Sequence, residues 1–296
     1  MARFWRKLRL TLEMIKFEHS VFALPFALTG ALLAWRDANF EIPDLRYRLM
    51  WIVVAMVAAR SAAMTFNRLL DADIDSRNQR TANRHLPAGH LSTGFAWGFT
   101  TLAIVIFLWA SRELGRLCLL LAPLALGILF FYSFSKRFST YSHLVLGFCL
   151  GMAPAAAWIA VRGTLDARIL WLTLAVTLWT AGFDIIYSCQ DYAFDVAEGL
   201  FSIPRRFGIA KALWLARIFH VSMVAALIAL VISFHLGVLS FIGILAVAVL
   251  LVYEHGLVKP DDLSRVNAAF FTVNGYVSVL FFIFWAADIL LHRAAA

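Results

Sequence analysis

The chain has 296 residues, of which 62% are hydrophobic and only 15% are charged, and its mean hydropathy is +0.80. Globular domains contain about 45–50% apolar residues, so this composition excludes an ordinary soluble domain. The net charge of +8 would suggest nucleic-acid binding in a soluble protein, but in a membrane protein its distribution among the loops matters more. The sequence predicts an all-α integral membrane protein that lies in the lipid bilayer and binds no nucleic acid.

Segments of sufficient length and apolarity to cross a hydrocarbon core of about 30 Å recur along the whole chain. In chain order, the predicted spans cover residues 20–36, 49–69, 95–111, 117–134, 142–161, 169–190, 212–233, 236–254 and 269–291. No linker rich in Pro or Ser divides them, so we expect one domain over residues 1–296, built as a bundle of nine transmembrane helices. Gly147 and Gly151 form a small-xxx-small pair, which predicts close packing of their helix against a neighbour.

The distribution of Lys and Arg predicts the orientation in the membrane. These residues are about twice as frequent in the loops on the N-terminal side as in the loops on the other side. We therefore expect a multi-pass protein of a bacterial cytoplasmic (inner) membrane, with the N-terminus inside. The segment from Phe4 to Phe17 suits either a basic amphipathic surface helix, with Leu8, Leu12 and Ile15 on one face, or a solvated basic tail.

Two polar stripes stand out against the apolar background. Residues four apart lie on one face of a helix, so Asn67, Asp71 and Asp75 form the first stripe, with Arg60 two turns earlier on the same side. The second stripe consists of Asp184, Tyr187, Asp191 and Asp195. An even number of predicted helices separates the two stripes, so both emerge on the same side of the membrane, which the charge distribution assigns to the cytoplasm.

Clustered carboxylates at these positions indicate a bound cation. A charge at the centre of a bilayer costs about 2.5–3.5 kcal/mol even on the milder scale, so a chain that keeps several of them has a use for them. Hard oxygen ligands select magnesium, which usually takes one or two carboxylates together with phosphate oxygens of a substrate. Two such sites facing each other would bind a diphosphate from both sides and make it a better leaving group.

Basic residues and loop donors follow each stripe, as phosphate binding would require. After the first stripe come Arg77, Arg80, Thr81, Arg84, Pro87 and Gly89, and after the second come Gly199, Ser202, Pro204, Arg205 and Arg206. Any single arginine among them is equally well explained as an ordinary cytoplasmic loop residue. The combination of two DxxxD stripes, two basic tails and one membrane face favours a site for a diphosphate.

Three alternatives follow from the same residues. An ion-coupled membrane transporter also keeps buried charges, but transporters place them near the midplane on interrupted helices, whereas these lie at helix ends. A non-catalytic lipid-binding scaffold would not need two intact DxxxD motifs. A soluble isoprenoid synthase would share the metal chemistry, and the apolar spans exclude it.

The two stripes also carry a family resemblance. NRLLDADIDSRNQRTANRHLPAG at 67–89 resembles the first signature of the UbiA superfamily of intramembrane prenyltransferases, and DIIYSCQDYAFDVAEGLFSIPRRFG at 184–208 resembles the second. The similarity extends over essentially the whole chain, including the predicted helix count. It implies magnesium-dependent transfer of a polyprenyl group from a polyprenyl diphosphate to a small aromatic acid.

The resemblance implies roles for residues at matching positions. Metal ligands would be Asn67, Asp71 and Asp75 for one magnesium ion and Asp191 and Asp195 for the other. The residues expected to bind the diphosphate are Arg80, Arg84, Lys136, Arg137 and Ser202. Tyr187 would lie near the allylic carbon, where an aromatic face can stabilise a cation. We expect Asp191, Tyr187 and Arg60 to act in catalysis, and Asp73, which is off the stripe, to be solvated or to support the ligands.

Two further expectations concern the aromatic acceptor. The segments KFEHSVFALPFAL at 16–28 and GLFSIPRRFG at 199–208 resemble the branch of the family that acts in the futalosine route to menaquinone. That resemblance favours 1,4-dihydroxy-6-naphthoate as acceptor, with 4-hydroxybenzoate, the acceptor of ubiquinone biosynthesis, as the alternative. Arg60, deep in a span, needs a partner, which is either Asp184 in a structural ion pair or the carboxylate of the acceptor.

Overall fold

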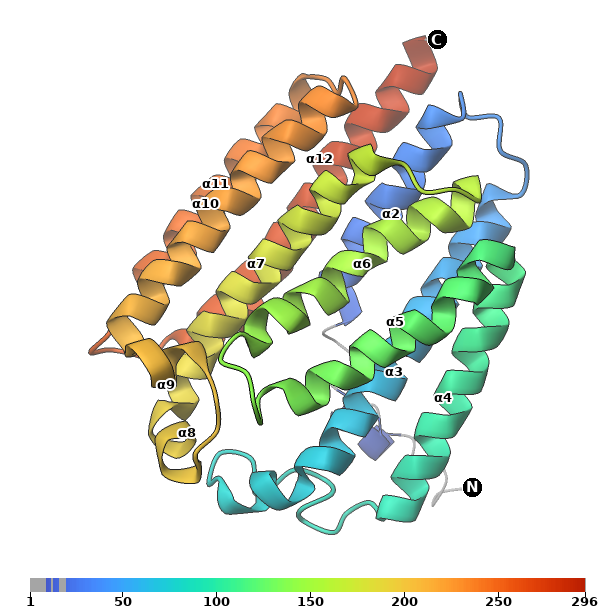
Figure 1. The fold of residues 1–296 in the computed structure, drawn as a ribbon. Helices are drawn as coiled ribbons and strands as arrows, with labels where there is room; N and C mark the ends of the chain where they lie inside the picture. Colours follow the sequence, from blue (N-terminus) through green and yellow to red (C-terminus); the bar gives the residue numbers. More distant parts are fainter. Residues whose placement is uncertain (1–8, 12, 16–19, 296) are drawn as a thin grey trace. The chain divides into compact units, whose positions relative to one another are not determined.

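The computed structural model describes residues 9–11, 13–15 and 20–295, and the regular elements of these residues are helices (Figure 1). The contacts of the chain group into two compact units. Unit 1 consists of residues 1–20 and 50–134, and unit 2 of residues 21–49 and 135–296. The all-α fold class is confirmed. A single domain over residues 1–296 stays a prediction.

Unit 1 contains three long helices and a short N-terminal helical segment. The long helices are α3 (Leu45–Arg77, of which the part from Met50 belongs to this unit), α4 (Thr93–Leu114) and α5 (Arg116–Ser135). Met14 and Ile15 are buried against Leu86 and Leu91 in the loop between α3 and α4. Ile15 therefore packs against this loop, and Leu8 and Leu12 of the predicted amphipathic segment lie outside the described residues, so the choice between a surface helix and a solvated tail stays a prediction.

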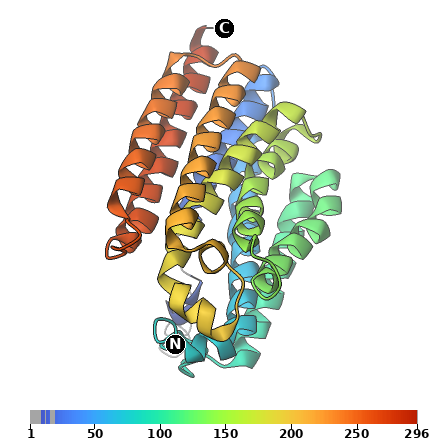
Figure 2. The ribbon, with the colours of Figure 1, turned by 60° about the vertical axis from the view of Figure 1, so that its left-hand side comes forward.

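Unit 2 is the larger bundle. Its helices are α2 (Ser20–Asp37), α6 (Ser142–Arg162), α7 (Leu170–Ser188), α8 (Tyr192–Glu198), α9 (Ile203–Phe207), α10 (Ile209–Ser233), α11 (Val238–Leu257) and α12 (Asn274–Ala295). A π-helical turn, η4 (Ala268–Val273), precedes α12. The two short helices α8 and α9 lie together at one end of this bundle, beyond the end of α7 (Figures 1 and 2).

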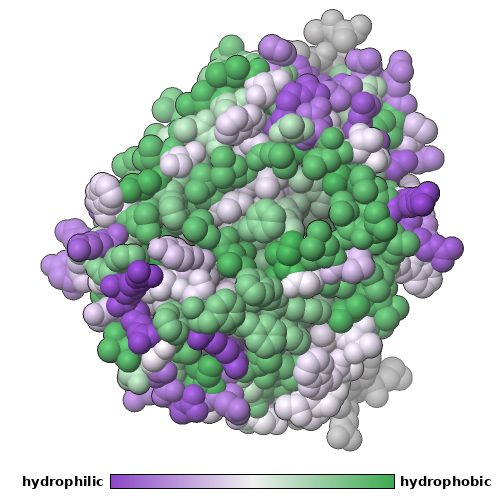
Figure 3. Space-filling model, in the orientation of Figure 1, coloured by the Kyte–Doolittle hydropathy of each residue, from purple (hydrophilic) through white to green (hydrophobic). Residues whose placement is uncertain are grey.

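The helices have the length and apolarity of membrane spans. Among the described residues, eight helical segments are long and apolar enough to cross a bilayer. Hydrophobic side chains cover much of the visible surface, and hydrophilic ones gather mainly towards its edges (Figure 3). The remaining predicted span, residues 20–36, which is the first in chain order, forms α2, an 18-residue helix with Pro25 inside it and Arg36 in its last turn. The chain is thus a multi-pass membrane protein, and the count of nine spans is approximate.

The predicted close packing at Gly147 and Gly151 is confirmed, and the neighbour is α7. A Cβ atom added at Gly147 would overlap the backbone oxygen of Thr177, and one added at Gly151 would overlap the Thr177 hydroxyl. Small residues therefore bring α6 and α7 into backbone contact, which is how helices associate where the lipid offers no hydrophobic driving force. This packing fixes the position of α7, which carries Asp184 and Tyr187 of the second stripe.

A buried polar network fixes the π-helical turn beside α7. The indole Nε1 of Trp179 donates to Oδ1 of Asn274 (2.6 Å), and Nδ2 of Asn274 donates to Oε1 of Glu254 (2.7 Å) and to the Ala269 carbonyl (3.1 Å). Trp179, Asn274 and Glu254 are all fully buried, so each polar atom needs such a partner. The network holds η4, which carries Phe270, against α7.

Candidate active site

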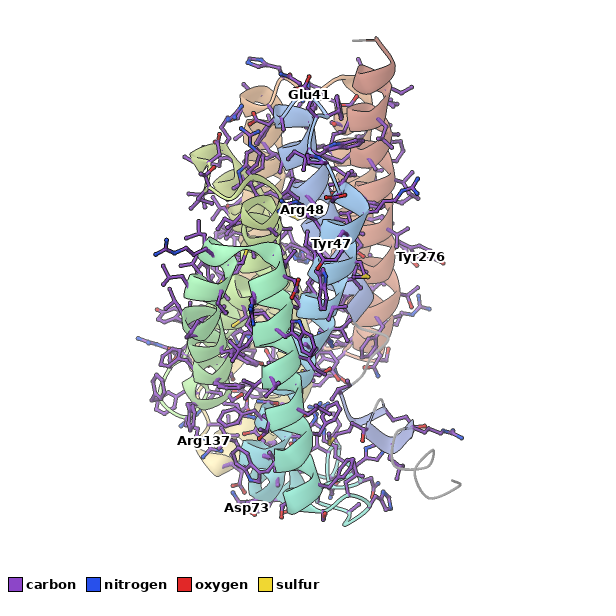
Figure 4. The ribbon with its side chains drawn as sticks, turned by 90° about the vertical axis from the view of Figure 1, so that its right-hand side faces the viewer. Glu41, Tyr47, Arg48, Asp73, Arg137 and Tyr276 are labelled. Carbon is purple, nitrogen blue, oxygen red and sulfur yellow. The ribbon has the colours of Figure 1, made fainter. Side chains whose placement is uncertain are left out.

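The first stripe occupies the last turns of α3 in unit 1. Asp71 and Asp75 are 1% and 5% exposed, whereas Asp73 is exposed at the end of the helix (Figure 4). Asn67, one turn before Asp71, is half-buried. The prediction that Asp71 and Asp75 share a face, and that Asp73 lies away from it, is therefore confirmed.

Both buried carboxylates of the first stripe have defined partners. The amide Nδ2 of Asn67 donates to Oδ2 of Asp71 (3.2 Å), which directs the amide oxygen of Asn67 away from that carboxylate. Nη1 of Arg84 lies 2.7 Å from both oxygens of Asp75. The Thr81 hydroxyl donates to the Asp75 carbonyl (3.0 Å) and ties the loop to the helix end. Asp75 thus positions the side chain of Arg84, which lies in the loop after α3.

Arg68 is a residue of this half that the sequence interpretation did not single out. Its Nη1 lies 3.9 Å from Oδ2 of Asp75, and only 13% of its side chain is exposed. Arg68 lies in the first motif, seven residues before Asp75. Because residues seven apart share a face of an α-helix, this spacing could have indicated that Arg68 lies near Asp75. Arg80, in contrast, is exposed, and Arg60 is half-buried in the middle of α3. The roles predicted for Arg60, Arg80 and Arg84 stay predictions.

The second stripe, in unit 2, differs from the expected continuous helical stripe. α7 ends at Ser188, a 3₁₀ turn (η3) covers Cys189–Asp191, and α8 begins at Tyr192. A 3₁₀ turn has three residues per turn rather than 3.6, so it rotates the following residues relative to α7. Asp191 and Asp195 consequently belong to two different elements, and the spacing of four residues alone does not place their side chains.

Ser202 supports Asp195 directly. Its hydroxyl donates to Oδ2 of Asp195 (2.7 Å) and accepts from the backbone N–H of Arg205 (3.3 Å), which makes Ser202 the N-cap of α9. Gly199, with φ of +73°, ends α8 and allows the chain to return towards Asp195. Ser202 and Asp195 are 5% and 9% exposed. The predicted binding of diphosphate by Ser202 stays a prediction.

Asp184 pairs with a histidine from another helix. Oδ2 of Asp184 lies 2.7 Å from Nδ1 of His143, near the start of α6, and Nε2 of His143 accepts from the backbone N–H of Ile203 (3.4 Å). His143 is 3% exposed. The sequence offered no signal for this contact, because a lone histidine near a helix end is usually a packing residue. Both alternatives for Arg60, pairing with Asp184 or binding the carboxylate of the acceptor, stay predictions, and Asp184 has a partner from α6.

Tyr187 lies in an aromatic cluster. Its ring centroid is 4.2 Å from that of Phe270 and 6.0 Å from that of Phe271, both on η4. Phe270 also contacts Phe183, one turn before Tyr187, with 5.2 Å between the centroids. Such rings present negative faces that attract a cation. The structure therefore surrounds the residue expected near the allylic carbon with further aromatic side chains.

The loop between α5 and α6 contributes two basic residues to unit 2. The Lys136 carbonyl accepts from the backbone N–H of Phe201 (2.9 Å), which joins this loop to the segment before Ser202. The Lys136 side chain is half-buried, whereas Arg137 is exposed and lies at the edge of the ribbon (Figure 4). The loop that carries Lys136 is thus bonded to the segment that connects α8, which carries Asp195, to Ser202. Diphosphate binding by Lys136 and Arg137 stays a prediction.

The donor atoms fit magnesium bound together with a substrate. Among the described residues, no group of three or more His, Cys, Asp or Glu side chains forms a metal site by itself. The first stripe offers the carboxylates of Asp71 and Asp75 and the amide oxygen of Asn67, and the second offers the carboxylates of Asp191 and Asp195. Magnesium usually takes one or two carboxylates and completes its coordination with water and phosphate oxygens. The residues therefore suit a metal that arrives with a phosphorylated substrate.

Comparisons with known proteins identify relatives over nearly the whole chain. The model of the UbiA prenyltransferase family matches residues 23–287. The 4-hydroxybenzoate octaprenyltransferase of Vibrio cholerae is 32% identical over 277 residues, which cover 92% of this chain and 95% of that protein. The mitochondrial 4-hydroxybenzoate polyprenyltransferase of Aedes aegypti is 33% identical over 188 residues, 63% of this chain but only 42% of that protein.

Solved structures share the fold. The apo structure of a UbiA homolog from Aeropyrum pernix superposes with a TM-score of 0.81 and 32% sequence identity, covering 93% of this chain and 98% of that one. A UbiA homolog from Archaeoglobus fulgidus bound to DMAPP and Mg²⁺ gives a TM-score of 0.71, with 95% of this chain and 99% of that chain covered. At 19% identity, this second likeness shows the fold alone.

Proposed function

The chain belongs to the UbiA prenyltransferase family, and from that premise we propose that it transfers a polyprenyl group from its diphosphate to a hydroxylated aromatic acid. As a prenyltransferase it is an enzyme, so neither the transporter nor the lipid-binding scaffold describes it. The observation that carries the proposal is the pair of acidic stripes at helix ends of a membrane protein, in which Asp71, Asp75 and Asp195 are buried. Buried carboxylates in a membrane protein need partners; Asp75 has Arg84 and Asp195 has Ser202, and a bound cation would balance the negative charge that remains.

Magnesium is the proposed cofactor, held by Asn67, Asp71 and Asp75 in one stripe and by Asp191 and Asp195 in the other. When bound, it neutralises the charge of the diphosphate and so makes it a better leaving group. The support from this chain is the hard-oxygen donor set and the fixed orientation of its members. Asn67 is oriented by its hydrogen bond to Asp71, and Asp195 by the hydroxyl of Ser202.

The basic residues near each stripe are proposed to hold the diphosphate. Arg84, already positioned by Asp75, offers the remaining donors of its guanidinium, and Lys136 and Arg137 offer theirs from the loop before α6. Tyr187, with Phe270 beside it, is proposed to stabilise positive charge that develops on the allylic carbon as the bond to the diphosphate breaks. The electron pair of that bond leaves with the diphosphate, a ring carbon of the acceptor forms the new bond, and the proton of that carbon is then lost to water, which restores the aromatic ring.

Two acceptors are supported by different observations. The segments at 16–28 and 199–208 favour 1,4-dihydroxy-6-naphthoate, which we propose first. The relatives named above are 4-hydroxybenzoate prenyltransferases, which favours 4-hydroxybenzoate as the second candidate. Both acids carry a ring hydroxyl and a carboxylate, so the same site chemistry serves either one. The proposed location is the inner membrane of a bacterium, with both acidic stripes on the cytoplasmic side.

The decisive experiment is a transfer assay with purified protein in detergent or proteoliposomes. One polyprenyl diphosphate is offered with each aromatic acid separately, and the prenylated acid is identified by mass spectrometry. We expect magnesium-dependent product with one acid at a kcat/KM at least tenfold above the other. Product formation at full rate in excess chelator would contradict the role of magnesium, and no product with either acid would contradict the proposed acceptor class.

A further inference from the structure

The pair of His143 and Asp184 has no role in the proposed function, although Asp184 precedes Tyr187 by only three residues on α7. It joins α6 to α7 through one short contact, 2.7 Å between Nδ1 and Oδ2. The histidine side chain is 4% exposed and the aspartate side chain 19% exposed. The pair is therefore asymmetric: the imidazole is enclosed by protein, and the carboxylate is its accessible end.

The partners of His143 determine what the pair presents. Because the backbone N–H of Ile203 can only donate, Nε2 of His143 must accept, and the ring proton of a neutral imidazole then resides on Nδ1. Nδ1 donates to Oδ2 of Asp184, which fixes the orientation of the carboxylate plane. Within unit 2, Oδ1 of Asp184 receives no hydrogen bond from the described residues. Asp184 thus presents one oriented acceptor oxygen.

The position of Asp184 along α7 relates it to the proposed reaction. Tyr187 follows by three residues, close to one helical turn, so these two residues lie on roughly the same side of α7. Asp191 lies beyond the end of α7, in the 3₁₀ turn η3. With a rise of about 1.5 Å per residue, Asp184 lies roughly 6 Å inside the last residue of α7, Ser188, whereas Asp191 lies beyond that end. From the helix end inwards, the order is therefore Asp191, a proposed metal ligand, then the ring of Tyr187, then the carboxylate of Asp184.

This order matches the order of the reacting groups. The nucleophile approaches the allylic carbon from the side opposite the leaving diphosphate, so the acceptor lies beyond the carbon that Tyr187 faces. In a hydroxylated aromatic ring, the carbon next to the hydroxyl is electron-rich and reacts most readily. A hydrogen bond from that hydroxyl to a carboxylate increases the electron density of the ring and fixes its orientation.

We propose that Asp184, oriented by His143, accepts a hydrogen bond from the ring hydroxyl of the aromatic acceptor and directs the neighbouring ring carbon towards the allylic carbon. The inference rests on the proposed function, because it assumes a hydroxylated aromatic acid as substrate. Asp184 is then a binding residue for the acceptor, and His143 is a positioning residue that acts through Asp184. The competing explanation is that the pair only ties α6 to α7.

The test compares two ligands that differ in one hydrogen-bond donor. The first is the accepted aromatic acid, and the second is its methyl ether, measured as a competitive inhibitor. Asp184→Asn keeps the shape but removes the charge that accepts the hydroxyl proton. We expect the apparent KM for the hydroxy acid to rise about 10- to 100-fold, the range for a lost hydrogen bond to a charged group. The inhibition constant of the methyl ether and the KM for polyprenyl diphosphate should change less than threefold.

Substitutions at His143 separate positioning from packing. His143→Asn places an amide N–H near the position of Nδ1 and should leave the KM for the hydroxy acid within threefold of wild type, whereas His143→Leu should raise it as Asp184→Asn does. Ser240→Ala is the matched control, because the buried Ser240 hydroxyl donates to Oδ2 of Asp288 (2.8 Å) and so ties α11 to α12 elsewhere in unit 2. The unfolding temperature of each variant reports the structural effect.

The outcomes separate this inference from the proposed function. If Asp184→Asn weakens the hydroxy acid and its methyl ether equally, or lowers the unfolding temperature with equal loss for both substrates, the pair is a structural tie and the inference is wrong. A wild-type protein that prenylates no hydroxylated aromatic acid overturns both the proposed function and the inference. An active wild type with unchanged acceptor constants in Asp184→Asn overturns the inference alone.

Discussion

Replacing Ser202 by Ala should change the response to magnesium more than it changes stability. The Ser202 hydroxyl makes two hydrogen bonds: it donates to Oδ2 of Asp195 at 2.7 Å and accepts from the backbone N–H of Arg205 at 3.3 Å. The first orients a proposed metal ligand, and the second caps α9. Because both Ser202 and Asp195 are buried, water cannot readily replace either bond in the Ser202→Ala variant.

The two bonds predict two separate magnitudes. Loss of an N-cap hydroxyl costs about 1 kcal/mol of stability. Loss of a hydrogen bond to a buried carboxylate costs about 1.5–3 kcal/mol, of which the part that orients Asp195 for the metal weakens magnesium binding. If about 1.4 kcal/mol of this loss falls on magnesium binding, the dissociation constant of magnesium rises tenfold. We therefore expect the magnesium concentration for half-maximal transfer to rise about tenfold.

The assay is release of diphosphate at saturating polyprenyl diphosphate and acceptor, with magnesium varied. Ser92→Ala is the matched control, because Ser92 caps α4 in the same way, accepting from the backbone N–H of Phe95 (3.3 Å), and lies in unit 1, outside both stripes. We expect Ser92→Ala to lower the unfolding temperature without changing the magnesium response. Equal magnesium responses of the two variants would refute the argument, and a change confined to the KM for polyprenyl diphosphate would favour direct contact of Ser202 with the diphosphate.

Four further substitutions test the site and its orientation. Asp71→Ala or Asp191→Ala should reduce transfer by at least 10³-fold while the protein still inserts into the membrane, because each removes a metal ligand; near-normal turnover at saturating magnesium would contradict the proposed metal sites. A cysteine at position 92 in place of Ser92 should react only with thiol reagents that reach the cytoplasm, and its labelling in intact cells by an impermeant reagent would reverse the orientation. Arg60→Lys keeps the charge but loses the planar fork, so it should raise the KM for the aromatic acid alone if Arg60 binds the carboxylate of the acceptor. Equal losses for both substrates would leave Arg60 with a structural role.

The membrane character, the helices and the acidic stripe of α3 could be predicted from the sequence alone. A bilayer requires about 20 apolar residues per helix, and that requirement is local, so hydropathy located the spans. The alignment of Asp71 and Asp75 on one buried face follows from the periodicity of a single helix, as does the exposure of Asp73. The family could be recognised because the residues that carry the chemistry are contiguous in two short segments.

The partners of the site residues were decided by the tertiary structure. His143 meets Asp184 across 41 residues of sequence, and this contact depends on how closely α6 packs against α7. The 3₁₀ turn at Cys189–Asp191 likewise interrupts a stripe that the spacing suggested was continuous. Helical periodicity specifies which side chains share a face of one helix. It contains no information about which neighbouring helix that face meets, because packing and hydrogen bonding between distant segments select the partner.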